Sequence, residues 1–134
     1  DVAARTLAPP APALDLSRAN LTRDARFHVE LLAPDEGIAI NRIQSWHLRL
    51  STPDGAPISK ALVYLNGDMP EHGHGMPTRP MTHGEVSPGT YRVDGVKLSM
   101  AGRWELVVAV QANGKEDLAY FNVVIALPPA RPAP

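Results

Sequence analysis

Residues 103–125 read R-W-E-L-V-V-A-V-Q-A-N-G-K-E-D-L-A-Y-F-N-V-V-I, and this stretch decides the fold. Its first half has large apolar residues at every second position: Trp104, Leu106, Val108 and Val110. That spacing is the period of a β-strand with one buried face. The second half repeats it, and Asn113-Gly114 between the halves is the strongest short signal for a hairpin turn. The stretch therefore predicts two antiparallel strands joined by a tight turn.

The same period of two recurs over most of the chain, in the segments 26–32, 42–51, 61–66, 90–100, 103–111 and 117–126. No segment has a convincing helical period, and Thr52-Pro53-Asp54-Gly55 has the composition of a turn. One solvated face per strand favours antiparallel sheets. We therefore predict an all-β fold, an immunoglobulin-like antiparallel β-sandwich of about seven strands. The side chains that we expect between its sheets are Trp46, Leu48, Trp104, Leu106, Val108, Phe121 and Val123.

The two ends of the chain differ from its middle in composition. Residues 1–25 begin with an Ala/Pro-rich segment that cannot build a core, so we interpret them as an N-terminal linker. Within it, 14–24 is expected to form a short helical turn with Leu14, Leu16 and Leu21 inward. The sandwich domain is assigned to 26–126, and 127–134 is a Pro-rich tail. The segments 1–13 and 128–134 are expected to lack regular secondary structure.

Charge and composition exclude several function classes. The formal net charge is −1, which argues against a nucleic-acid partner, and the chain has no Cys, so zinc–thiolate sites and disulfides are ruled out. Its apolar runs are too short to span a bilayer. The chain starts at Asp1 rather than at Met. We expect a removed signal peptide or a trimmed anchor before it.

The segment 68–84 concentrates metal-binding side chains. It reads D-M-P-E-H-G-H-G-M-P-T-R-P-M-T-H-G and holds six of the nine Met and His residues of the chain: Met69, His72, His74, Met76, Met81 and His83. Three Pro and three Gly argue against a helix or a central strand. We therefore expect one long exposed loop, in which these methionines have no core to fill. Thioether and imidazole are both copper donors.

The spacing of the donors indicates how a site is built. His72 and His74 are two residues apart, so their side chains point the same way in extended chain. Met69, Met76 and Met81 are the nearest thioethers, with Met69 expected first. Met100 either packs in the core or leans over the loop, and His83 either completes the donor set or is simply solvated. Alone, His-Gly-His is more often a solvated surface loop; the flanking methionines favour a site.

Two further patterns, Gly89-Thr-Tyr-Arg-Val and Gly102-Arg-Trp-Glu-Leu, are typical of late sandwich strands in which the aromatic residue anchors a corner. Together with the segments 61–65, 69–76 and 98–106, they resemble the FixH/YtkA-like family over about residues 26–126. The resemblance implies an extracytoplasmic bacterial β-sandwich domain, with links in some members to copper handling or cytochrome oxidase assembly. Some members carry a membrane helix near the N-terminus, so membrane association is expected only through a missing anchor.

The sequence and this resemblance together predict a periplasmic copper-binding protein, a carrier, chaperone or store, and not an enzyme. Copper(I) is favoured by the thioethers, and copper(II) is also accepted. The expected partners are the copper ion and a copper-receiving or cytochrome oxidase assembly protein. Two alternatives stay open: a metal-free structural or protein-binding module, and a copper enzyme.

Overall fold

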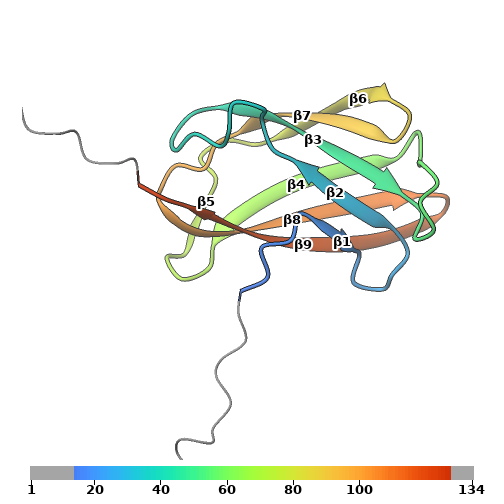
Figure 1. Cartoon of the computed structure of the whole chain (residues 1–134), viewed down its shortest axis with the longest axis horizontal. Coiled ribbons are helices and arrows are strands. Elements are labelled where there is room, and N and C mark those ends of the chain that lie inside the picture. The colour runs from blue at the N-terminus through green and yellow to red at the C-terminus, as the bar shows by residue number, and fades with distance from the viewer. Residues whose placement is uncertain (1–13, 128–134) are drawn as a thin grey trace, which may run out of the picture.

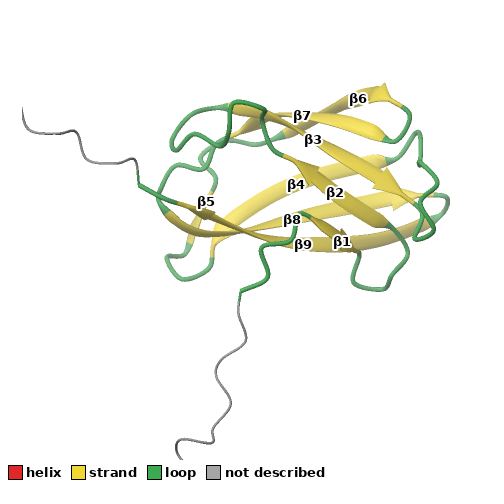
Figure 2. Cartoon of the chain, viewed as in Figure 1, coloured by secondary structure: helices red, strands yellow, loops and turns green. Residues whose placement is uncertain are grey.

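The computed structural model describes residues 14–127, so the expectations for 1–13 and 128–134 lie outside the described residues. All regular structure in 14–127 is β (Figure 2). The strands are β1 (Ala19–Leu21), β2 (His28–Leu32), β3 (Gln44–Ser51), β4 (Leu62–Met69), β5 (His74–Gly75), β6 (Met81–Ser87), β7 (Thr90–Val96), β8 (Gly102–Ala112) and β9 (Lys115–Ile125). No described segment forms a helix that is long and apolar enough to cross a membrane.

The strands form two antiparallel sheets that pack face to face (Figure 1). One sheet has the order β1-β2-β3-β7-β6 and the other β5-β4-β8-β9. The seven side chains expected between the sheets are all buried. The predicted antiparallel sandwich is confirmed. Its nine strands exceed the expected seven because β1 and β5 are too short to show a period and β6 contains register shifts.

The β8–β9 hairpin is the longest uninterrupted strand pairing in residues 14–127. The two strands pair without a register shift from Ala112↔Lys115 at the turn to Gly102↔Ile125 at the far end. Asn113 and Gly114 have φ of 54° and 73°, and two positive φ values define the turn type that matches strand twist. The predicted hairpin is therefore confirmed.

The two aromatic residues of the Gly-x-aromatic pattern anchor loops through their polar groups. Tyr91 donates its hydroxyl to the carbonyl of Ile58 at 2.8 Å and accepts from the amide of Ala61 at 3.0 Å. Burial raises the pKa of Tyr91, although the Ala61 bond acts against it. The indole Nε1 of Trp104 donates to the carbonyl of Met100 at 3.0 Å. Both rings thus fix the backbone of a neighbouring loop.

A buried carboxylate joins the first turn to the second sheet. Asp117 accepts from the amides of Leu118 and Asp24 at 2.9 Å and of Arg26 at 3.3 Å. Burial alone would raise the pKa of Asp117, but these bonds and one from the Thr22 hydroxyl outweigh it, so the pKa lies below its ordinary value. The turn between β1 and β2 is therefore held in place by an ionised group on β9.

The helical turn expected over 14–24 is wrong. Ala19–Leu21 is strand β1, paired with β2 in the register Ala19↔Glu30 and Leu21↔His28. The three leucines expected to face inward, Leu14, Leu16 and Leu21, are all exposed. Pairing with an open sheet edge outweighs the weak local preference of a short segment.

Candidate metal site

The segment 68–84 is not the single exposed loop that was expected. It comprises the end of β4, a turn over 70–73, the short strand β5, a connection over 76–80 and the start of β6. β6 is an edge strand, where Gly and register shifts are tolerated. The six donors of this segment are therefore divided between the two sheets, and only some of them meet.

Met69 ends β4 in the core. The inward face of β4 runs through Val63, Leu65 and Gly67 to Met69, whose exposed fraction is 0%. The expectation that Met69 lies in an exposed loop with no core to fill is therefore wrong. Gly67 occupies one of these inward positions but has no side chain, so the alternation of apolar and polar residues cannot be seen in the sequence there. The thioether of Met69 is consequently held within the sandwich, at one end.

The turn after Met69 folds two histidines back beside it. The carbonyl of Met69 accepts the amides of His72 at 3.0 Å and Gly73 at 2.9 Å, and Gly73 has the positive φ that this tight turn requires. β5 then pairs His74 directly with Met69. The sequence therefore places both exposed imidazoles next to the end of β4.

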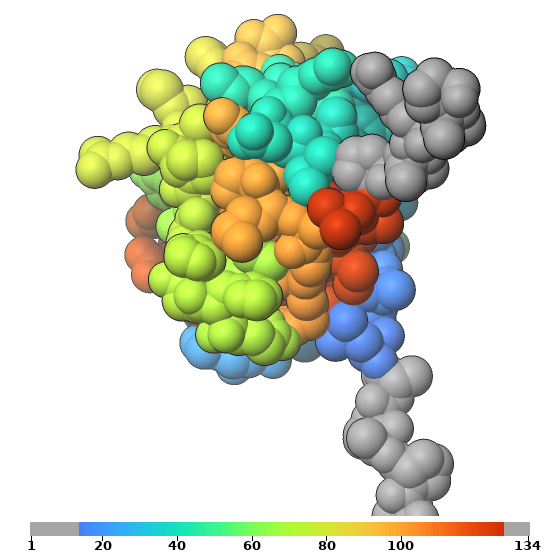
Figure 3. Space-filling model, turned by 90° about the vertical axis from the view of Figure 1, so that its left-hand side faces the viewer, coloured from blue at the N-terminus to red at the C-terminus, as the bar shows by residue number. Residues whose placement is uncertain are grey.

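Gly102, the first residue of β8, is the point where the donors converge. A Cβ built on Gly102 would lie 2.8 Å from Met69 Cε and 3.9 Å from His72 Nε2. These two atoms are therefore at most the sum of 2.8 and 3.9 Å apart, about 6.7 Å. Figure 3 looks onto this end, where the yellow-green 70–76 segment lies beside the orange 97–103 segment. The absence of a side chain at Gly102 leaves room for both donors.

The two imidazoles lie side by side. The ring centroids of His72 and His74 are 6.3 Å apart and the ring planes are 16° from parallel. An ion lies in the plane of each imidazole that binds it, so in this stacked arrangement one ring has to turn for both to share an ion. Both residues are exposed, so nothing packed around them opposes that rotation.

Met100 and Met76 have different surroundings. Met100 is 41% exposed and lies on the segment that enters β8. The alternative that Met100 packs in the core is therefore not observed. Its carbonyl is held by Trp104, two residues from Gly102. Met76 packs against the core, and its methyl lies 2.9 Å from where a Cβ on Gly67 would be. Met76 thus fills the gap that Gly67 leaves.

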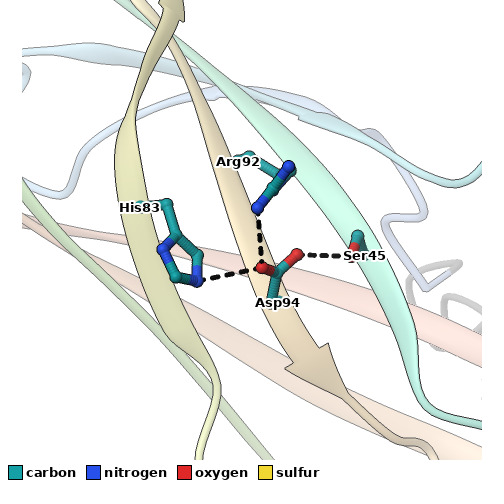
Figure 4. A network of polar contacts seen from close by, with 4 residues as sticks. All are labelled: Ser45, His83, Arg92 and Asp94. Atoms are coloured by element: carbon teal, nitrogen blue, oxygen red, sulfur yellow. Dashed lines mark hydrogen bonds and ion pairs between the residues drawn. The ribbon is translucent and has the colours of Figure 1, made fainter.

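Met81 and His83 lie on β6 of the other sheet, away from Gly102. His83 Nε2 is 2.9 Å from Asp94 Oδ2 on β7, and Asp94 also accepts from Ser45 and Arg92 (Figure 4). The Ser45 bond is the main reason that the pKa of Asp94 lies below its ordinary value, with the charge of Arg92 acting in the same direction against burial. The structure therefore does not bring these two donors to His72 and His74.

Arg103 lies at the site although no pattern in the sequence selects it. Its Nε donates to Glu71 Oε1 at 2.7 Å and its Nη1 to Asn122 Oδ1 at 2.7 Å. The hydrogen bond from Arg103 to Glu71 is the main reason that the pKa of Glu71 lies below its ordinary value. Glu71 immediately precedes His72, so the pair ties the 70–73 turn to β8. Only the position of Arg103 beside Gly102 and Trp104 could have suggested this role.

The donors gathered at this end are mixed in type. Within residues 14–127, no group of three or more His, Asp or Glu side chains is arranged to hold a metal ion by itself. The groups that do converge are one buried thioether and two exposed imidazoles, with a second thioether nearby at Met100. A metal held by three or more donors at this end would therefore need methionine sulfur.

Comparison with known proteins places the chain in a family. No curated protein and no solved structure matches the chain. A family model described as YtkA-like matches residues 23–109, which run from the β1–β2 turn into β8 and include Met69, His72, His74 and Gly102. The match covers well over half of the chain, as the resemblance predicted. The chain belongs to the YtkA-like family.

Proposed function

We propose that this YtkA-like protein binds copper at the Gly102 end of the sandwich and acts as a copper carrier, chaperone or store. The observation that carries the proposal is the convergence of the Met69 thioether and the His72 imidazole over Gly102. His74, stacked on His72, supplies the next donor, and the exposed Met100 a further one. These four residues are the ligands that we assign.

The donor types favour copper(I). Imidazole alone accepts zinc, nickel and copper(II), with copper(II) bound most tightly of the divalent ions. A thioether is soft and adds little affinity for zinc, but it suits copper(I). The chain has no Cys, so no thiolate is available to hold the ion very tightly. We therefore expect an affinity that permits transfer of copper to another protein.

The burial of the ligands supports a carrier rather than an enzyme. Met69 is fully buried and fixed, whereas His72 and His74 are exposed on a turn. A recipient can therefore replace the imidazoles one at a time while Met69 keeps the ion in place.

One group of side chains resembles a hydrolase triad in composition only: Ser45, Asp94 and His83. Asp94 lies between the other two, and no base contacts the serine.

The resemblance to FixH/YtkA-like domains supports a location and a class of partner for this proposal. We place the protein outside the cytoplasm, in the bacterial periplasm, as implied for FixH/YtkA-like domains. A copper-receiving protein or a cytochrome oxidase assembly protein is the corresponding partner class. The near-neutral charge of the chain fits a partner of this kind better than nucleic acid.

The test is a pair of metal titrations with matched variants. Copper(I) is titrated anaerobically against a coloured chelator, and copper(II) and zinc are titrated separately. The double change His72→Ala with His74→Ala should abolish copper(II) binding and leave the fold intact, because exposed turn residues contribute little to the core. The control is His28→Ala with His47→Ala, two strand histidines outside the site.

Two outcomes refute the proposal. One is a double variant that binds copper(II) as well as the parent. The other is a parent protein that prefers zinc to copper(I) under matched conditions. Anomalous scattering at the copper edge from a soaked crystal would identify the ligands directly, with Met69 and His72 expected nearest the ion.

A further inference from the structure

Met81, His83 and Asp94 form a separate cluster on the five-stranded sheet. Met81 of β6 lies directly opposite Asp94 of β7. Directly paired residues point to the same face of a sheet. Val93, next to Asp94, points into the core with 0% exposure, so Asp94 and Met81 point outward. His83 is placed on this outer face by its contact with Asp94 (Figure 4).

The contact with Asp94 determines which nitrogen of His83 is free. Nε2 of His83 lies 2.9 Å from Oδ2 of the carboxylate. An ionised carboxylate only accepts hydrogen bonds, so Nε2 carries the proton and the neutral ring keeps a free lone pair on Nδ1. Histidines that bind metals ordinarily donate their other ring N–H to a carboxylate or carbonyl in this way. His83 is thus oriented as a metal ligand would be.

Asp94 is itself fixed on both oxygens. Ser45 donates to Oδ1, and Arg92 Nη2 donates to Oδ2 at 3.1 Å. Three strands therefore contribute to the position of one imidazole: β3 through Ser45, β7 through Arg92 and Asp94, and β6 through His83. The charge of Arg92 is balanced by Asp94, so the cluster carries no net positive charge that would repel a cation.

Met81 supplies a soft donor on the same face. It is 65% exposed, so its thioether is accessible and not used for packing. It precedes His83 by two residues, on the strand edge that no other strand covers in residues 14–127. We propose that Met81 Sδ and His83 Nδ1 bind a second copper(I) ion on the outer face of this sheet, with Asp94 as a positioning residue.

This second site is independent of the one at Gly102, and it is tested in protein that lacks the two histidines of that site. The His72→Ala/His74→Ala protein is titrated anaerobically with copper(I) and followed by NMR. The chain has four Met, so each methyl signal is assigned by single substitution. We expect the Met81 methyl and the His83 ring nitrogens to shift together as one equivalent binds. Before copper is added, the ¹⁵N shifts should show Nδ1 of neutral His83 unprotonated.

Variants separate ligands from the positioning residue. Met81→Leu and His83→Gln should each weaken copper(I) binding about tenfold or more. Asp94→Asn should weaken it by about 10- to 100-fold, the range found for partners that orient a ligating histidine, without changing which two signals move. His28→Gln is the control, a strand histidine without a carboxylate partner in residues 14–127, and should have no effect.

Three results overturn the second site: a Met81 methyl that does not respond to copper(I), binding that survives Met81→Leu unchanged, or an Asp94→Asn variant with parental affinity. The middle result would mean that Met81 is not a ligand. Because these measurements use protein without His72 and His74, their failure leaves the proposed function standing. Conversely, if the Gly102 site of the parent protein binds no copper, the NMR signals of Met81 and His83 should still shift when copper(I) is added.

Discussion

Gly102→Ala is the sharpest test of the geometry at the end of the sandwich. The new methyl group would lie 2.8 Å from Met69 Cε, whereas carbon atoms in contact are about 3.5–4.0 Å apart. The Met69 methyl therefore has to move by about 1 Å, away from the new methyl group. Gly102 also has φ of 125°, a conformation that an L-residue adopts only with strain. The substitution thus combines backbone strain with a steric clash.

The two contributions have separable magnitudes. Backbone strain of this kind destabilises by about 1–3 kcal/mol. Met69 is flexible but fully buried, so displacing it adds an overpacking penalty of about 1–3 kcal/mol. Gly55→Ala is the matched control, because Gly55 has φ of 101° and nothing within 4 Å of its added Cβ. Gly55→Ala should therefore lose only the free energy of unfolding that comes from backbone strain.

Urea denaturation of the metal-free proteins measures the stability difference, and chelator competition measures copper(I) affinity. We expect Gly102→Ala to be less stable than Gly55→Ala by about 1–3 kcal/mol. We also expect it to bind copper(I) at least about tenfold more weakly, since metal–ligand distances tolerate only about 0.2 Å. Met69→Leu keeps the volume without the sulfur, so it should lose affinity while stability changes by less than about 1.5 kcal/mol.

The reasoning is refuted if Gly102→Ala matches Gly55→Ala in stability and the parent in copper(I) affinity. Met69 and His72 would then not meet over Gly102. A loss of stability with unchanged affinity would separate the packing of Met69 from metal binding, and it would refute Met69 as a ligand.

Three further predictions concern the scaffold. Tyr91→Phe removes the partner of the Ile58 carbonyl and the Ala61 amide, so it should destabilise by about 1–3 kcal/mol in urea denaturation, and unchanged stability would contradict the anchoring role. Asp117→Asn should lower stability at pH 7 by about 1–3 kcal/mol. The pKa of Asp117 is lower in the folded protein than in the unfolded chain, where it is about 3.9. The carboxylate therefore contributes fully to the free energy of unfolding above the unfolded pKa, and this contribution is lost as the pH falls through the lower folded pKa. Parent and variant should therefore converge in stability below about pH 4, and a constant gap in urea denaturation down to pH 2 would contradict this. Asn113→Ala places an L-residue without a polar side chain at positive φ, which should destabilise by about 1 kcal/mol, again measured by urea denaturation.

The sandwich was predictable where alternation is uninterrupted. β3, β8 and β9 have apolar side chains at every second position, and the sequence alone defines their buried faces. β4 was predicted only to residue 66 because Gly67 and Asp68 interrupt the pattern before Met69. β6 was missed because its pairing with β7 shifts register twice, which removes any simple period.

The candidate site was predictable in its donor types and only partly in its membership. His72 and His74 belong together because a single residue, Gly73, separates them, and the turn that it closes brings both imidazoles back beside Met69. Met81 is close in sequence, but the chain has by then crossed to the other sheet, where strand pairing brings it opposite Asp94. Gly102 is distant in sequence and is brought to the site by the pairing of β4 with β8. A local excess of Met and His predicts copper chemistry, whereas strand register decides which of these residues lie close together.

The register of the β8–β9 hairpin also has a consequence for folding kinetics. Its contacts begin at the Asn113-Gly114 turn, where sequence separation is smallest, and end at Gly102↔Ile125. Pairing of β4 with β8, which completes the site, closes a loop of roughly 40 residues and so carries a larger entropic penalty. We therefore expect the hairpin to be formed in the folding transition state and the proposed copper ligands to assemble after it. An ion bound by ligands that assemble late should slow unfolding and leave the rate of folding almost unchanged.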